Sequence, residues 1–400
     1  MIYLYIILAF FIFIFLKSFI RVFRSYRFIG KFRNQEFTAP KDKKLTLIIP
    51  VYKEVNNIEK SVLYFKDLAD KCNVYYVTTS KEEDGATFKE VENQIAKHNT
   101  TNIFLMNCPN TEGNMATQIT YMAKNLQPDD IIGLYNIDSF PELKTFDFIL
   151  ANIEKGMCYQ QLSYFEDDLD GAMASAQDWQ NRWSIVYEMG KLAKESNFLN
   201  FKYTIGHGLF IYQEDLARLG YWDDTIINED NELGYRMLCN NFKIKAIPYL
   251  EKAEFAHSKS IYVKQQSTWF NGPLYAFDYY KREKRKGKKA SLLYAMLNFK
   301  AAVSWLLLPW FFYTHIIISA FFSWWIFAIY IVMLIAYLSG INFCARQVLY
   351  KYGYLKKRFS RRNILSDIFF FTMHTIGPMI TLKKLITGKN TIKNKYKTEK

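Results

Sequence analysis

Residues 44–70, "KLTLIIPVYKEVNNIEKSVLYFKDLAD", decide the fold. The run 44–52 is short and apolar, which predicts a buried strand ended by Pro50, whereas 56–70 places apolar residues at helical spacing. Strands that alternate with helices of this length indicate right-handed β-α-β units. The stretch therefore predicts an α/β domain with a mainly parallel sheet.

The alternation continues downstream. The expected strands are 74–80, 101–108 and 129–138. The expected helices between them are 87–98 and 115–126. Polar clusters stand at the strand ends, as "PVYKE", "TTSKEED" and "NIDSF". Ligands of open α/β sheets bind outside the carboxyl ends of the strands, so we expect these clusters to share one rim.

Long apolar segments lie on both sides of this domain. Residues 1–16 carry no charge, and 1–23 lack a positive leader and a small-residue cleavage site, so they read as a retained anchor. Residues 301–345 are uncharged and long enough for two spans. Residues 364–382 contain polar residues between basic flanks, which favours an interfacial or re-entrant segment over a fourth span.

The formal net charge of +14 is concentrated beside these apolar segments, for instance in "KREKRKGKK" (281–289) and "KKRFSRR" (356–362). The positive-inside rule predicts such runs, and they place the flanks on the cytoplasmic side. No nucleic-acid-binding motif accompanies the charge. The five cysteines show no CxxC pairing, which is typical of reduced thiols.

The sequence thus predicts a multi-pass protein of the cell membrane with a cytoplasmic soluble domain. The expected parts are an anchor at 1–23, a basic linker at 24–43, an α/β domain at 44–275, a basic juxtamembrane region at 276–300, two transmembrane helices at 301–345, and a basic tail at 346–400 that includes 364–382.

Asp138 closes a strand that needs no acid for folding, and Asn136 points to the same side of it. A carboxylate at the rim can hold Mg²⁺ or Mn²⁺, ions that bridge phosphate oxygens, while the amide can donate to a sugar hydroxyl. The alternative is a turn before a helix, which "DSFPE" also suits.

Glu229 and Asp230 open a predicted helix behind Asn228, in "INEDNELGYRM" (227–237). One of these acids could be a general base that deprotonates an attacking hydroxyl. Both could equally be structural, because acids near a helix N-terminus are favoured by the dipole and by capping.

Two histidines are further candidates. His207 lies between two glycines in "TIGHGLFI" (204–211), where the backbone can approach a ligand closely. His257, in "AEFAHSKS" (253–260), is a candidate metal ligand. A structural role is the alternative for each.

Gln265, Gln266 and Trp269 lie together in "KQQSTWFNGP" (264–273). Amide donors beside an aromatic face make a platform for a sugar ring. The alternative is a tryptophan at the membrane interface, which this position also allows.

In this order and at these spacings, the clusters resemble the family 2 glycosyltransferases of GT-A fold. The similarity is to their membrane-anchored branch, which includes cellulose and hyaluronan synthases and bacterial exopolysaccharide enzymes. The motifs that carry it are "LIIPVYKEVNNIEKSV", "TEGNMATQITYMAKNL", "NIDS", "GHGLFI", "NEDNELGYRM" and "QQSTWFNG".

The resemblance implies an α/β GT-A domain with N- and C-terminal transmembrane helices, and an inverting transfer with Mn²⁺ or Mg²⁺. It assigns the site residues as follows: Asp230 as base with Glu229 beside it, Glu54, Asn136 and Asp138 at the donor, Asp138 at the metal, and His207, Gln265, Gln266 and Trp269 at the diphosphate or acceptor. The expected partners are a nucleotide sugar, first a uridine diphosphate sugar, membrane lipid, a lipid-linked or polysaccharide acceptor, and a synthase or export complex.

The chain departs from the family pattern at Lys53, Asn114, Asn136 and Thr268. These departures keep open a second function, a non-catalytic subunit that binds nucleotide sugar or scaffolds a synthase complex. The intact Glu229–Asp230 pair favours the enzyme.

Overall fold

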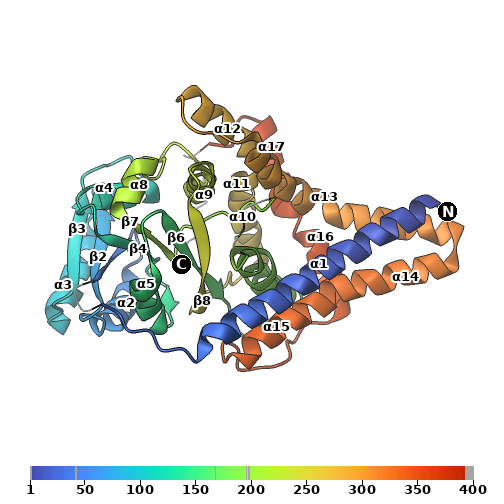
Figure 1. The fold of residues 1–400 in the computed structure, drawn as a ribbon, viewed down its shortest axis with the longest axis horizontal. Helices are drawn as coiled ribbons and strands as arrows, with labels where there is room; N and C mark the ends of the chain where they lie inside the picture. The colour runs from blue at the N-terminus through green and yellow to red at the C-terminus, as the bar shows by residue number, and fades with distance from the viewer. Residues whose placement is uncertain (1, 41–42, 167, 195, 197–198, 392–400) are drawn as a thin grey trace.

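The computed structural model describes residues 2–40, 43–166, 168–194, 196 and 199–391. In this part of the chain, one eight-stranded sheet has the order β3-β2-β1-β4-β7-β6-β8-β5 (Figure 1). The strands are β1 (Leu45–Pro50), β2 (Cys72–Thr79), β3 (Ile103–Cys108), β4 (Ile131–Leu134), β5 (Phe140–Pro141), β6 (Met157–Tyr164), β7 (Leu209–Tyr212) and β8 (Lys243–Lys252).

The sheet is mixed but mainly parallel, as predicted. The pairs β3-β2, β2-β1, β1-β4 and β6-β8 are parallel, and β7 runs antiparallel to both of its neighbours, β4 and β6. Short β5 closes the far edge antiparallel to β8. The reversal at β7 places the chain before β7 next to the chain after β4.

Helices cover the sheet and extend beyond it. In the soluble part they are α2 (Val55–Lys66), α3 (Ala86–His98), α4 (Met115–Lys124), α5 (Lys144–Asn152), α6 (Gly171–Arg182), the π-helical η1 (Trp183–Met189), α7 (Gly190–Leu192), α8 (Gln213–Leu219), α9 (Glu229–Cys239), α10 (Lys259–Trp269), α11 (Asn271–Leu274) and α12 (Ala276–Arg285). Outside it are α1 (Ile2–Arg33), α13 (Leu292–Phe322), α14 (Trp324–Ile335), the π-helical η2 (Ala336–Gly340), α15 (Ile341–Lys351), α16 (Ile364–Met373) and α17 (Ile376–Ile386).

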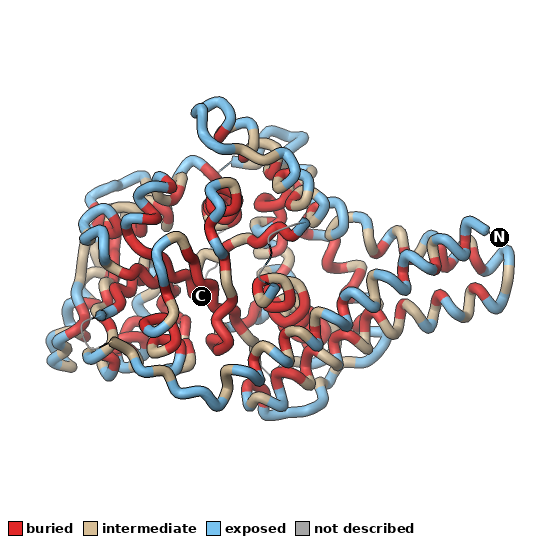
Figure 2. Tube along the Cα trace, viewed as in Figure 1, coloured by how far each residue is buried: buried red, intermediate tan, exposed pale blue. Residues whose placement is uncertain are grey.

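A hydrophobic core lies on each face of the sheet. One core joins the strands to α2 and α5, through residues such as Phe65 and Phe146. The other joins them to α4, η1 and α9, and includes Ile119, Ile185 and Leu233. Figure 2 shows these inner helix faces and the strands as buried.

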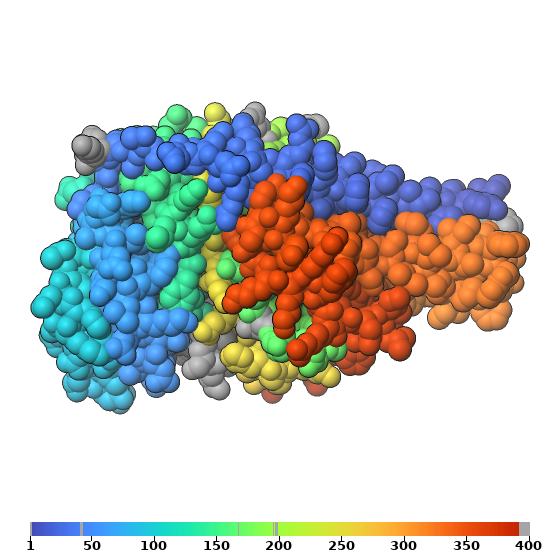
Figure 3. All heavy atoms as spheres, turned by 90° about the horizontal axis from the view of Figure 1, so that it is seen from below, coloured from blue at the N-terminus to red at the C-terminus, as the bar shows by residue number. Residues whose placement is uncertain are grey.

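Among the described residues, four helical segments are long and apolar enough to cross a membrane, namely Ile2–Arg33, Leu292–Phe322, Trp324–Lys351 and Ile364–Ile386. Helices α1, α13 and α14 project from the sheet domain as one arm, in which α1 lies beside the other two (Figures 1 and 3). In the most apolar stretch of Ile2–Arg33 and of Leu292–Phe322, only 22% of the residues are buried. The arm therefore presents an apolar surface that suits lipid.

Helix α1 continues well past the apolar residues. The predicted basic linker begins at residue 24, but the helix runs on to Arg33. Ser25 Oγ donates to Ile185 O (2.5 Å), and Arg33 Nη1 donates to Glu142 Oε2 (2.6 Å). The anchor and the soluble domain are therefore packed together.

Candidate active site

The turn after β4 carries Asn136 and Asp138. The Asn136 N–H donates to Ser139 Oγ (3.3 Å) and the Ser139 N–H donates back to Asn136 O (3.1 Å). This tight turn was one of the two roles that the sequence allowed, and it is present together with a buried carboxylate, since Asp138 is only 6% exposed.

The loop before β7 lies next to this turn. The Gly208 N–H donates to Leu134 O (2.6 Å), at the end of β4. Gln160 fixes the loop from the other side, because its Nε2 donates to His207 O (2.7 Å) and its Oε1 accepts from the Ile205 N–H (2.8 Å). His207 is therefore presented at the same rim as Asp138.

His207 is held by a second buried acid. Its Nδ1 contacts Glu251 Oε1, and the same oxygen accepts from Ser163 Oγ (3.0 Å). Burial acts to lower the pKa of His207, but the negative charges of Glu251, Asp138 and Glu188 outweigh it and raise that pKa above its ordinary value. The site thus favours a cationic imidazole near Asp138, which suits an anionic substrate.

Helix α9 brings Asp230 to the same loop. Thr204 Oγ1 donates to Asp230 O (2.6 Å), and a Cβ added at Gly206 would lie 3.6 Å from Asp230 Oδ2. The helix approaches this closely because Gly234 has no side chain, since a Cβ there would lie 2.8 Å from Thr204 N. The Asp230 carboxylate therefore faces the backbone beside His207.

Glu229 and Glu54 lie at the starts of two helices. Glu229 is the first residue of α9 and is 8% exposed, and Glu54 is the N-cap residue of α2, in the short connection after β1. One departure from the family motifs has a structural reason here. Asn114 caps α4, because its side chain accepts from the Thr117 N–H (3.2 Å).

Gln265, Gln266 and Trp269 all lie on α10, but they differ in how far they are buried. Gln266 is 2% exposed and packs against α17. A Cβ added at Gly377 of that helix would lie 2.7 Å from the Cβ of Gln266. Gln265 keeps partial exposure, and Trp269 is 41% exposed. Of the three, Gln265 and Trp269 are the ones accessible to a substrate.

Acids and histidines do not cluster as a preformed metal cage. Among the described residues, no group of three or more His, Cys, Asp or Glu side chains could hold an ion. His257 is exposed in the loop that follows β8. Asp138 nonetheless fits a divalent cation, because Mg²⁺ sites at nucleotides use one or two carboxylates plus substrate phosphates.

Two contributing residues were not predicted from the sequence: Gln160 and Glu251. Glu251 had a detectable signal, an acid inside the apolar strand "IPYLEK" (247–252). Gln160, likewise, is a fully buried amide within β6. Buried polar side chains need partners, so such positions indicate a hydrogen-bonding site.

The sheet order, the acidic turn at its rim and the helix opened by two acids define an α/β protein of the GT-A glycosyltransferase fold. Residues 177–339 match the family model described as glycosyl transferase family group 2. This range runs from α6 through α9 and α10 into η2, and over it the predicted resemblance to the family 2 enzymes is confirmed. The matched range includes α9, the apolar segment Leu292–Phe322 and part of the segment Trp324–Lys351.

A solved structure with a TM-score above 0.5 supports this fold. The chain is similar to the mannosyltransferase PcManGT from Pyrobaculum calidifontis, solved with GDP-Man and Mn²⁺, at 13% identity and a TM-score of 0.52, over 94% of this chain and 98% of that chain. It also matches S. aureus TarS 1–349 at 12% identity and a TM-score of 0.39, over 86% and 92% of the two chains. Among curated proteins, none matches the sequence.

Proposed function

We propose that this protein is an inverting, metal-dependent glycosyltransferase. It moves a sugar from a nucleoside diphosphate donor, first a uridine diphosphate sugar, to a lipid-linked or polysaccharide acceptor in surface glycan synthesis. The observation that carries the proposal is the position of the Asp230 carboxylate. Asp230 Oδ2 lies 3.6 Å from the position that a Cβ on Gly206 would take, and Gly206 directly precedes His207.

The reaction requires a base, a nucleophile and a leaving group. Asp230 accepts the proton of an acceptor hydroxyl, whose oxygen bonds to the anomeric carbon as the bond to the donor diphosphate breaks. His207, whose pKa is raised, places positive charge near the departing diphosphate. Asp138 and Asn136 would hold Mn²⁺ or Mg²⁺, which offsets negative charge on the leaving group when bound.

The membrane arrangement supports an acceptor in or at the bilayer. The apolar arm continues directly into the soluble domain, and the basic residues that follow it favour the cytoplasmic side. Nucleotide sugars are made in the cytoplasm, so the donor site and its substrate would then share a compartment.

The rival function is a non-catalytic subunit of a synthase complex. Asn136 and Thr268 favour it, because each stands where the family motif has a charged side chain. Against it, Asp230 remains beside the glycine loop as a base would.

The test is release of nucleoside diphosphate from a donor panel by the purified protein in lipid nanodiscs, with cell-derived lipid acceptors and with or without Mn²⁺. Asp230→Asn is expected to reduce turnover by about 10²–10⁴-fold, the usual contribution of a general base. Asp138→Ala should abolish metal-dependent release. Asp129→Asn, at an 85% exposed side chain, is the matched control and should behave as wild type.

Donor binding without turnover across the whole panel would favour the scaffold. A fully active, correctly folded Asp230→Asn protein would contradict the assignment of the base. Thermal unfolding of each variant separates loss of chemistry from loss of fold.

A further inference from the structure

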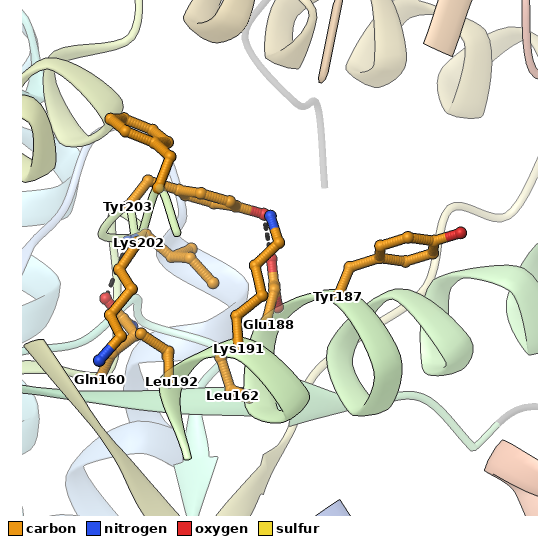
Figure 4. Close-up of a pocket in the computed structure, with 10 residues that line it drawn as sticks. Gln160, Leu162, Tyr187, Glu188, Lys191, Leu192, Lys202 and Tyr203 are labelled. Carbon is orange, nitrogen blue, oxygen red and sulfur yellow. Dashed lines mark hydrogen bonds between the residues drawn. The ribbon is translucent and has the colours of Figure 1, made fainter. Parts of the chain in front are cut away.

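Three side chains form a hydrogen-bonded triangle between η1 and the loop before β7. The Tyr203 hydroxyl donates to Glu188 Oε1 (2.6 Å). Trp183 Nε1 donates both to Glu188 Oε1 (2.9 Å) and to the Tyr203 hydroxyl (2.8 Å). Figure 4 shows the Tyr203 side chain reaching from the loop to Glu188, whereas Tyr187 of the same helix points away from both. The triangle therefore joins the loop directly to the helix.

The π-helical geometry of η1 makes this triangle possible. Trp183 and Glu188 are five positions apart, and in an α-helix such side chains would point about 140° away from each other. A π-turn is wider and closes on the fifth residue, as shown by the Gly190 N–H, which donates to Ile185 O. The wider turn brings the two side chains to one face of the helix. Turns of this kind are rare and are found frequently at functional sites.

Glu188 is a buried carboxylate that the packing of η1 does not require. It is 8% exposed, and burial of a carboxylate costs free energy unless the group is hydrogen-bonded. Burial raises the pKa of Glu188 above its ordinary value, while the hydrogen bonds from Tyr203 and Trp183 act in the opposite direction. An apolar side chain would fill the same place without this cost. The hydrogen bonds that Glu188 accepts are therefore the reason to look for a role.

The loop leads from Tyr203 straight to the candidate base. Thr204, the next residue, donates from Oγ1 to Asp230 O (2.6 Å). Helix α9 also packs on Tyr203 itself, since a Cβ added at Gly234 would lie 2.8 Å from Tyr203 Cα. His207 lies three residues beyond Thr204 in the same loop. The position of Tyr203 thus constrains the backbone next to both Asp230 and His207.

We propose that Glu188 is a positioning residue, which acts through Tyr203 to hold the loop before β7 where Asp230 can serve as the base. This inference rests on the proposed glycosyltransferase function and adds to it a residue that does not touch the reacting atoms. Groups that react must be closely aligned, and a displacement of about 1 Å can cost about 10²-fold in rate. Loss of the hydrogen bonds at Glu188 would free Tyr203, and with it Thr204 and its contact to Asp230.

The experiment compares four variants of the full chain in lipid nanodiscs, by the kcat and KM of nucleoside diphosphate release. Glu188→Met removes the hydrogen-bond acceptor and keeps most of the side-chain length, whereas Glu188→Gln keeps an oxygen that can accept from both partners. Tyr203→Phe removes the hydroxyl from the other end. Tyr187→Phe is the matched control on η1, because its hydroxyl lies 2.9 Å from the Tyr337 hydroxyl and not at the loop.

Glu188→Met and Tyr203→Phe should each lower kcat by about 10- to 100-fold and leave the KM of the donor unchanged, because Asp138 is held in another turn. Glu188→Gln and Tyr187→Phe should keep the wild-type kcat. Recovery with glutamine is a result that a general loss of stability would not give. A folded Glu188→Met protein with wild-type kcat would overturn the proposal, and so would equal losses in Glu188→Met and Glu188→Gln.

Hydrogen exchange of the loop tests the same role without turnover. The Ile205 N–H, which donates to Gln160 Oε1 (2.8 Å), should exchange faster in Glu188→Met than in wild type, and at the wild-type rate in Tyr187→Phe. Absence of nucleoside diphosphate release with every donor would remove the glycosyltransferase function, while exchange would still show whether Glu188 orders the loop. Turnover in wild type with unchanged exchange and unchanged kcat in Glu188→Met would remove the positioning role and leave the function.

Discussion

The two glycines around His207 have different surroundings. Gly208 has a φ of +64°, and a Cβ there would lie 2.9 Å from both Cβ and O of Gln161. At Gly206 a Cβ would meet only Asp230 Oδ2 at 3.6 Å and Met115 Cε at 3.7 Å, which are ordinary contacts. Gly208 is needed because the backbone there is left-handed, and Gly206 leaves space beside Asp230.

Alanine at these two positions should therefore separate stability from activity. Gly208→Ala is expected to destabilise the protein by at least about 1–2 kcal/mol, because of the left-handed backbone and the close Gln161 contacts. Gly206→Ala should keep the wild-type Tm but lower turnover, because its methyl group narrows the approach to Asp230. Thermal unfolding and nucleoside diphosphate release are measured on both; equal Tm values for the two variants would contradict this division.

The sequence predicts site residues whose type alone suggests chemistry. Asp138, His207 and Asp230 stood out because each is a polar residue at a strand or helix end, and the structure places them around one loop. Glu251 was missed because its contact with His207 depends on the packing of β8 beside β6, a pairing between distant parts of the chain. Burial of Gln266 likewise depends on α17, more than 100 residues later.

At the scale of elements, α10 connects the active site to the C-terminal helices. Ser267 Oγ and Thr381 Oγ1 are 2.9 Å apart, and Thr381 Oγ1 donates to Ser267 O (2.6 Å). Gly377 allows α17 to lie against α10. Gly272 of α11 allows α9 to approach closely, because a Cβ added at Gly272 would lie 3.1 Å from Asn231 Cγ. These contacts form a continuous packed path from α17 through α10 and α11 to α9.

Gly377→Ala tests this connection. Its Cβ would lie 2.7 Å from Gln266 Cβ and 2.8 Å from Ser267 N, so α17 must move away, and overpacking of this kind typically costs about 1–3 kcal/mol. Both Tm and turnover should fall. Gly340→Ala is the control in another helical segment, because nothing lies within 4 Å of its Cβ position, and it should be neutral or stabilising.

Among the elements, the sequence predicted β1 to β4 and the helices between them, because local apolar spacing specifies each one. The predicted strand 129–138 is shorter in the structure, since β4 ends at Leu134 and the turn takes the rest. The sheet order beyond β4 could not be predicted. Insertion of β7 between β4 and β6 is set by long-range pairing, which leaves no local pattern.

At the scale of the whole molecule, buried ion pairs join the soluble domain to the membrane-side helices. Asp178 of α6 accepts from Arg346 Nη1 of α15 (2.8 Å) and from Arg362 Nε (2.7 Å), just before α16. Arg362 also contacts Asp367. The Asp178 side chain is fully buried, so the network lies inside the junction between the two parts.

Asp178→Asn should loosen this junction. Removing one partner of a buried charge network typically costs about 3–5 kcal/mol, because the remaining charges stay buried. Asp168→Asn is the matched control, since Asp168 is 60% exposed and pairs with Lys357 (2.8 Å) at the surface, where solvent and salt screen the ion pair. Tm measured in detergent should fall clearly for the first variant only, and similar Tm losses would contradict a special role for the network.

The length of α1 has a consequence for the reach of the enzyme. Its 32 residues extend about 48 Å at 1.5 Å per residue, whereas the hydrocarbon of a bilayer is about 30 Å thick. The part of the helix that exceeds this thickness lies on the side of the soluble domain. There Ser25 donates a hydrogen bond to Ile185, and Arg33 donates one to Glu142. Helix α1 thus acts as a spacer of set length, which fixes the distance between the apolar arm and the sheet domain.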